Sequence, residues 1–196
     1  MNEFIVFEGI DGAGKTTLAK RLARDIDAAY IKTPGEGFSS AREYVDNGTP
    51  PDTKLLFYLA SVHDASAKIE RTLMERSVVC DRYIWSSLIP HSVYFNREFT
   101  QLERRVQPLL SNLSLPHRTI LVTVDEDEQL RRLTEERNPL KPTASDSFCF
   151  DTDKRRKVKS LYERIAERED WFVIDTTHKS ADDALKELQG ELYHVV

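Results

Sequence analysis

The residues with the clearest chemical potential lie near the start of the chain. Gly9-Ile-Asp-Gly-Ala-Gly-Lys15-Thr16 matches the spacing G-x-x-x-x-G-K-[ST] at every fixed position. Glycines let such a loop curl until successive backbone N–H groups point at phosphate oxygens, and the helix that follows contributes its positive end. Lys15 is predicted to reach the β and γ phosphates, and the Thr16 hydroxyl to ligate Mg²⁺. The residues predicted to contact ATP are Gly9, Asp11, Gly12, Ala13, Gly14, Lys15, Thr16 and Thr17.

A second cluster, Asp81-Arg82-Tyr83, ends another apolar run. A carboxylate at the end of a strand beside the loop can hold the magnesium shell, so the predicted metal site combines Thr16 with Asp81. Arg82 can bind a second anion in line with the γ-phosphate. The N-K-x-D guanine signature of GTPases is absent from the sequence. The pattern therefore favours phosphoryl transfer to a small acceptor over a guanine-nucleotide switch.

Short apolar runs alternate with helical spacings along the chain. Strands are predicted at 3–8, 28–32, 77–81, 118–125 and 171–175. Helices are predicted at 15–27, 53–75, 83–112 with interruptions at Pro90 and Pro108, about 126–137, 154–169 and 181–192. This alternation predicts an α/β fold, a single three-layer P-loop NTPase domain over residues 1–196 with a five-stranded parallel sheet flanked by helices. The active site is expected at the carboxyl ends of the strands, where Glu8, Asp81, Asp125 and Asp175 fall.

The composition limits the partners of the protein. Its 196 residues carry a formal net charge of -5, so no overall positive field would attract nucleic acid or a membrane surface. The first apolar run is too short for a signal peptide, and no run approaches the length of a membrane span. Two cysteines and five histidines show no paired metal-binding spacing. A cytoplasmic protein that acts on small molecules is expected, with no nucleic acid and no membrane as partner.

Several segments taken together resemble the thymidylate kinase family. They are FEGIDGAGKTT, the turn Pro34-Gly35, LLFYLASVHD at 55–64, Asp81-Arg82-Tyr83 and VID at 173–175, in this order over nearly the whole chain. The resemblance implies Mg²⁺-dependent transfer of the γ-phosphoryl group of ATP to a nucleoside monophosphate, with dTMP as the default acceptor, in a homodimer. It further implies that Asp11 contacts the sugar hydroxyl, that Phe57 stacks on the acceptor base, and that Arg82 binds the acceptor phosphate.

Three segments at the acceptor end depart from the family pattern. Ser61 stands four residues after Phe57, where these kinases place a base-binding arginine. Pro90 and His91 stand where they have the tyrosine and glutamine of S-x-x-A-Y-Q, and Lys32-Thr33 replaces the Arg-Glu of R-E-P-G. The identity of the base is therefore open. The acceptor-binding residues predicted from this resemblance are Asp11, Lys32, Phe57, Ser61, Arg82 and His91.

Two other functions remain open. The segments 75–78 (ERSV) and 81–84 (DRYI) are similar to segments of deoxynucleoside kinases, which phosphorylate a nucleoside 5′-hydroxyl. Those enzymes take a general base from a glutamate that Thr33 replaces here, although Glu36 lies three residues further on. A monophosphate already presents an anionic oxygen and needs no base, which favours a monophosphate acceptor. The other alternative is a non-catalytic nucleotide-binding protein.

Arginines flank an irregular segment that contains prolines. A lid at about 137–153 is predicted to close over the triphosphate and exclude water. Ala13 follows Gly12 in the phosphate loop, and the resemblance implies that family members without an arginine in this loop supply it from the lid. The predicted catalytic residues are Lys15, Arg82, Arg137 and Arg132. The resemblance places the adenine ring against the loop 176–180.

Overall fold

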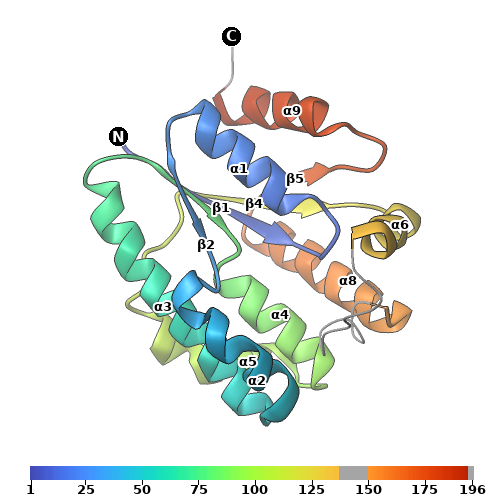
Figure 1. The fold of residues 1–196 in the computed structure, drawn as a ribbon. Coiled ribbons are helices and arrows are strands. Elements are labelled where there is room, and N and C mark those ends of the chain that lie inside the picture. Colours follow the sequence, from blue (N-terminus) through green and yellow to red (C-terminus); the bar gives the residue numbers. More distant parts are fainter. Residues whose placement is uncertain (137–149, 194–196) are drawn as a thin grey trace.

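A five-stranded parallel sheet forms the centre of the molecule (Figure 1). The structure is a computed structural model that describes residues 1–136 and 150–193. The strands are β1 (Phe4–Gly9), β2 (Ala29–Lys32), β3 (Val78–Asp81), β4 (Arg118–Thr123) and β5 (Phe172–Asp175). Their order across the sheet is β2-β3-β1-β4-β5, and every neighbouring pair is parallel. The predicted α/β fold is confirmed.

Helices cover both faces of this sheet, as Figure 1 shows. One face carries α1 (Lys15–Asp25) and α9 (Ala181–Tyr193). The other carries α3 (Pro51–Leu73), α4 (Ile84–Tyr94) and α8 (Thr152–Arg168), and α5 (Phe99–Leu110) packs against α4. The helix α6 (Glu126–Glu136) follows β4. Because the central strand β1 is covered on both sides, all six of its residues are buried, which explains its nearly continuous apolar sequence.

The strand order brings two loops together at one edge of the sheet. The chain leaves β1 to form β2 at the outer edge, returns to β3 beside β1, and then crosses to β4 on the other side of β1. The segments that follow β1 and β3 therefore leave the sheet side by side, where Phe7 is in register with Asp81. Such a switch point is where open α/β sheets bind their ligands.

Two helices occupy the region predicted as one interrupted helical stretch, and the break is not at a proline. Pro90 lies inside α4, and Pro108 lies inside α5. The chain turns at Asn96, which has a left-handed φ of 50°, and the N–H of Arg97 donates to the carbonyl oxygen of Ser92 at 2.8 Å. This arrangement is a Schellman motif, which ends α4 through backbone bonds. The predicted interruptions at the two prolines are therefore wrong.

The sequence patterns miss a helical segment between β2 and α3. The short η1 (Glu36–Phe38) and the helix α2 (Ser39–Gly48) occupy a region where proline and glycine predict only a loop. Within α2 only Val45 is buried. The helix is short and lies between two segments rich in proline and glycine, 34–37 and 48–51, whose turn signals hide it in the sequence. It packs on α3 and brings polar side chains to the site described below.

The region predicted as a lid is described only at its end. Residues 137–149, with Arg137, lie outside the described residues. The helix α8 already begins at Thr152, because the side chain of Asp151 accepts the N–H of Lys154 as an N-cap. The helix predicted at 154–169 therefore begins two residues earlier than expected, and the lid at about 137–153 stays a prediction. In the described part of the chain, no helix has the length and apolar character to cross a membrane.

Candidate active site

Two glycines give the loop between β1 and α1 its shape. Gly9 has a φ of 134°, and a Cβ atom there would lie 2.1 Å from the carbonyl oxygen of Val122 on β4. Gly14 has a φ of 89° and is the N-cap of α1, which no side chain of the described residues caps. The positive end of α1 therefore faces the loop, as a phosphate site requires.

Lys15 is buried at the base of this loop, with 4% of its surface exposed. Its Nζ donates to the carbonyl oxygen of Ile10 at 2.5 Å. Burial, followed by the charge of Arg82, lowers the pKa of Lys15 from 10.5 to about 7, against the opposing effect of three nearby carboxylates. A phosphate anion at this place would favour the protonated ammonium again.

Thr16 and Asp81 meet at the carboxyl ends of β1 and β3. The Oδ2 atom of Asp81 accepts the hydroxyl of Thr16 at 2.6 Å and that of Tyr30 at 3.0 Å. Lys32 Nζ lies 3.7 Å from the same oxygen. Asp81 is fully buried, and its Oδ1 atom has no hydrogen-bond partner among the described residues. A buried carboxylate oxygen without a donor is unfavourable, and a divalent cation would satisfy it.

These oxygens fit Mg²⁺ as the predicted metal. Within residues 1–136 and 150–193, no group of three or more histidine, cysteine or acidic side chains is placed to hold a metal ion. Mg²⁺ usually keeps several waters and binds through one or two protein ligands together with substrate phosphates. Thr16 and Asp81 would therefore supply the protein's share of the coordination.

Arg82 and Asp11 form an ion pair between β3 and the phosphate loop. Arg82 Nη2 donates to Asp11 Oδ1, and Arg82 Nη1 donates to Ser86 Oγ at 3.4 Å. Arg82 has a φ of 71°, in the left-handed region that residues other than glycine seldom adopt. The two residues that the resemblance assigns to the acceptor phosphate and sugar are thus in direct contact.

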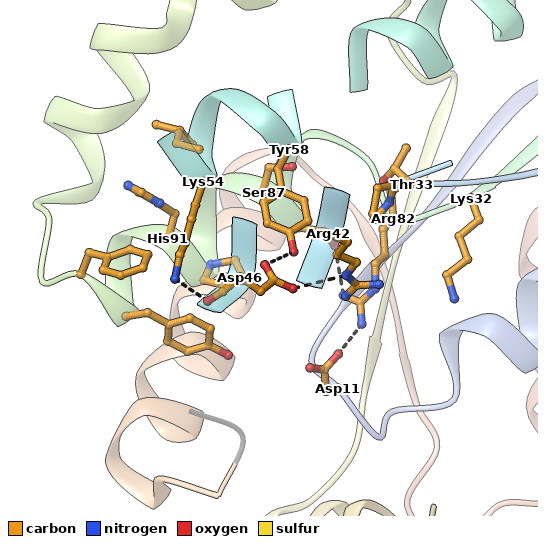
Figure 2. A pocket seen from close by; sticks show the side chains of 16 residues that line it. Asp11, Lys32, Thr33, Arg42, Asp46, Lys54, Tyr58, Arg82, Ser87 and His91 are labelled. Carbon is orange, nitrogen blue, oxygen red and sulfur yellow. Dashed lines mark hydrogen bonds and ion pairs between the residues drawn. The ribbon is translucent and has the colours of Figure 1, made fainter. Parts of the chain in front are cut away.

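Both residues lie in the wall of a cavity of about 290 Å³ (Figure 2). Side chains from the phosphate loop, the end of β2, α2, α3 and α4 form this wall. Lys32 and His91, two of the residues predicted to bind the acceptor, also lie in this wall. The volume is close to the lower end of the range for small-molecule sites. We call this space the acceptor cavity.

Asp46 of α2 organises one side of the acceptor cavity, as Figure 2 shows. Its Oδ1 atom accepts the hydroxyl of Tyr58 at 2.6 Å, and its Oδ2 atom lies 3.4 Å from Arg42 Nε. Its backbone carbonyl accepts Lys54 Nζ at 2.7 Å. Burial and the bond to Asp46 raise the pKa of Tyr58 to about 12, so this phenol remains protonated. None of these four residues is predicted from the sequence: Arg42 and Asp46 lie in a helix that was not predicted, and the spacing of α3 does not show that Lys54 and Tyr58 face the cavity.

Two residues predicted to bind the acceptor, Phe57 and Ser61, are not among the described residues that line this cavity. Among the described residues, the cavity wall on α3 is formed by Lys54, Leu55 and Tyr58. Phe57 points to a neighbouring position, where its ring packs edge-on against Phe38 at 5.4 Å. Ser61 is buried, and its hydroxyl donates to the carbonyl oxygen of Tyr58 at 2.7 Å. The contact of Phe57 and Ser61 with the acceptor therefore stays a prediction.

His91 lines the cavity but presents a neutral ring. Its Nε2 atom is buried and has no hydrogen-bond partner among the described residues. Burial is the main cause that lowers the pKa of His91 to about 4. The ring packs against Phe95 with a centroid distance of 4.8 Å. At neutral pH this histidine contributes shape and an uncharged nitrogen to the wall.

A second cavity, of about 180 Å³, adjoins the phosphate loop on the side of α9. Arg132 of α6 borders it and donates to the carbonyl oxygens of Gly12 at 3.3 Å and Thr176 at 2.9 Å. Glu128 orients this guanidinium from 2.8 Å. Arg132 thus joins the phosphate loop to the loop 176–180. Other predicted ATP contacts in this wall are Ala13, Gly14 and Thr17.

Comparisons with known proteins agree with this geometry. The sequence model of the family described as Thymidylate kinase matches residues 7–187. A protein of Methanocaldococcus jannaschii named "Probable thymidylate kinase" is 33% identical, over 99% of this chain and 97% of its own.

Solved structures show the same fold. The thymidylate kinase of Candida albicans superimposes with a TM-score of 0.77 at 20% identity, over 98% of this chain and 92% of its own. That of Ehrlichia chaffeensis superimposes with a TM-score of 0.74 at 22% identity, over 97% of this chain and 98% of its own. Sequence, fold and phosphate loop lead to one conclusion: the chain belongs to the thymidylate kinase family.

Proposed function

We propose that the protein transfers the γ-phosphoryl group of ATP to a nucleoside monophosphate, with dTMP as the acceptor and dTDP as the product. The observation that carries this proposal is the position of Asp11 and Arg82. Asp11 belongs to the phosphate loop, and both residues line the acceptor cavity. An acceptor bound there would have its phosphate beside Arg82 and close to the phosphate loop that holds the donor.

Positioning and charge neutralisation would drive the transfer. Lys15 would neutralise charge on the migrating group, and Arg82 would hold the acceptor phosphate. Thr16 and Asp81 would hold Mg²⁺, which would neutralise charge on the phosphate oxygens when bound. Arg132, through its bonds to Gly12 and Thr176, would fix the donor side of the loop.

The environment of Thr33 favours a monophosphate over a nucleoside acceptor. Thr33 stands where deoxynucleoside kinases carry their catalytic glutamate, and its hydroxyl donates to the carbonyl oxygen of Arg82 at 2.9 Å. A threonine engaged in this way offers no general base. Glu36 is exposed on η1 and does not belong to the described wall of the acceptor cavity. An acceptor that already carries an anionic oxygen needs neither residue.

One assay separates this function from its alternatives. ADP release from ATP and Mg²⁺ would be measured with a panel of nucleosides and nucleoside monophosphates, against the rate without acceptor. We expect turnover with dTMP far above that rate and none with thymidine. Turnover of nucleosides alone would identify a nucleoside kinase, and no stimulation by any acceptor would contradict a kinase function.

We also propose that two chains associate through α3. Leu56 is 57% exposed, and Ala60, one turn further on, is exposed beside it. An exposed apolar pair on the outer face of a long helix favours contact with another apolar surface. A second copy of the same face would provide one in a two-fold arrangement.

A further inference from the structure

Glu8, near the end of β1, is a buried carboxylate without a role in the transfer described above. None of its surface is exposed. Its Oε1 atom accepts the backbone N–H groups of Tyr83 at 3.0 Å and Trp85 at 3.1 Å. Its Oε2 atom accepts the hydroxyl of Ser86, and the hydroxyl of Tyr162 lies at 3.5 Å. Four donors thus converge on one side chain.

Such a carboxylate is unfavourable unless its surroundings compensate for the loss of water. Burial is the main influence on Glu8 and raises its pKa above the ordinary value of 4.5. The bonds from Ser86 and Tyr83 and the charge of Arg82 act in the opposite direction. The start of α4 adds the positive end of a helix dipole. The surroundings of Glu8 are therefore suited to a side chain that accepts several hydrogen bonds.

These bonds fix the start of α4. Tyr83 is the N-cap of this helix, and its own side chain makes no capping bond. Glu8 takes over that function from a neighbouring strand by accepting the N–H groups of Tyr83 and Trp85. The residue immediately before this cap is Arg82, whose left-handed backbone must be held by its surroundings.

Glu8 also reaches the Arg82 side chain through Ser86. The Ser86 hydroxyl donates to Glu8 Oε2, so its oxygen is oriented to accept Arg82 Nη1 at 3.4 Å. The other terminal nitrogen of this guanidinium, Nη2, donates to Asp11 in the acceptor cavity. Hydrogen bonds therefore connect Glu8, through Ser86, to the Arg82 guanidinium, which lines the acceptor cavity.

We propose that Glu8 is a positioning residue for acceptor binding: it holds the backbone after Arg82 and the Ser86 hydroxyl, and so aims the Arg82 guanidinium into the acceptor cavity. This inference rests on the proposed function, because it assigns the acceptor phosphate to Arg82.

The chemistry of the site calls for a carboxylate at this position. Both oxygens of Glu8 accept hydrogen bonds, whereas a glutamine would present an amide NH₂ to one pair of donors. In Glu8→Gln the carbonyl oxygen could still accept Tyr83 and Trp85. The NH₂ group would face the Ser86 and Tyr162 hydroxyls, so Ser86 would lose the acceptor that orients it toward Arg82.

The test compares steady-state kinetics of the wild type and Glu8→Gln, with dTMP and ATP varied in turn. Losing a charged hydrogen bond typically weakens an interaction by roughly ten- to a hundredfold. We expect KM for dTMP to rise by about this factor, while KM for ATP stays within about twofold. Equal acceptor KM values in the two proteins would overturn the inference.

A double-mutant cycle asks whether Glu8 acts through Arg82. The affinity for dTMP would be measured by calorimetry in Glu8→Gln, Arg82→Ala and the double variant. If Glu8 works by aiming Arg82, its substitution has little further effect once the guanidinium is gone. An equal loss of affinity in both backgrounds would contradict the proposal.

Leu188→Ala serves as the control for general destabilisation. This fully buried leucine lies in α9, on the opposite face of the sheet from α4, so its loss should lower Tm without separating the two KM values. Should Glu8→Gln fail to fold, Ser86→Ala carries the same test, with an expected rise of about threefold or more in acceptor KM. No rise would overturn the inference. A wild type without turnover of any monophosphate would instead refute the proposed function.

Discussion

The positive charge of Lys15 lies at a buried position, where the loss of water disfavours the charged ammonium. The phosphate loop surrounds this side chain, and burial lowers its pKa to about 7, which the charge of a bound phosphate would raise again. Lys15→Met keeps the length and removes the charge. We expect kcat to fall by about a hundred- to a thousandfold, as for other groups that stabilise transition-state charge. Lys186→Met on the exposed side of α9 is the matched control and should retain activity.

The same lysine predicts how stability depends on pH. The unfolded chain binds this proton with a pKa near 10.5 and the folded protein with a pKa of about 7, so between these values the unfolded state holds more protons. The penalty for burying the ammonium is therefore complete below pH 7 and is relieved as pH rises toward 10.5. Relative to Lys15→Met, the wild-type free energy of unfolding should rise by up to about 1.4 kcal/mol per pH unit.

Urea denaturation of both proteins at pH 7, 8 and 9 would test this difference. Stability curves that run parallel for wild type and Lys15→Met would show that the group does not titrate in this range.

Individual site residues can be predicted from the sequence where the chemistry requires a fixed spacing between neighbouring residues. The phosphate loop is one continuous stretch, so Lys15 and Thr16 are predicted from their neighbours alone. Asp81 and Arg82 are also adjacent, and the strand before them is apolar. Asp46 has no such context, because its partner Tyr58 lies twelve residues away on another helix.

The helices α2 and α3 decide which side chains reach the acceptor. Asp46 ties these helices together by accepting the Tyr58 hydroxyl and pairing with Arg42. Asp46→Ala should release both side chains from the cavity wall. We expect KM for the acceptor to rise about tenfold, the effect of one or two lost hydrogen bonds, with KM for ATP unchanged.

Asp64→Ala is the matched control for this variant. Asp64 also lies on the α2–α3 side of the molecule, but it is exposed and pairs only with Lys68 among the residues described. If Asp46→Ala and Asp64→Ala have the same KM for the acceptor, the contacts of Asp46 with Tyr58 and Arg42 have no role in acceptor binding.

Phe57 and Tyr58 show why the orientation of helix faces is difficult to predict from sequence. Neighbouring residues on a helix point about 100° apart, so the change from Phe57 to Tyr58 is a large rotation around α3. The apolar spacing correctly predicts that Leu59 and Val62 are buried. It cannot tell which adjoining residue faces the cavity, because that depends on α2, and α2 is not visible in the sequence pattern.

Assembly is the prediction that belongs to the whole molecule. If α3 pairs with its copy, light scattering coupled to size exclusion should give twice the chain mass of 22.6 kDa. Leu56→Glu would place two like charges near the two-fold axis, so it should shift the mass to that of a single chain. Lys68→Glu on the same helix changes charge away from this pair and is the control. A wild-type protein of 22.6 kDa would contradict the proposal.

The overall architecture follows from the alternation of strands and helices, and the order of the strands does not. Local apolar runs predict each strand, yet the position of β1 between β3 and β4 depends on contacts between residues more than seventy positions apart. That order is nonetheless what brings Asp11 and Arg82 together.

The bond between Thr33 and Arg82 has a consequence for how this enzyme class could diverge. A nucleoside kinase needs a carboxylate at position 33, but an ionised carboxylate only accepts hydrogen bonds and would repel the Arg82 carbonyl oxygen that Thr33 now satisfies. Thr33→Glu alone should therefore lose dTMP turnover without gaining thymidine turnover in the acceptor panel. A monophosphate kinase of this kind that became a nucleoside kinase would first need another donor to the Arg82 carbonyl oxygen. Only then could position 33 change to a carboxylate, so the two substitutions would have to occur in that order.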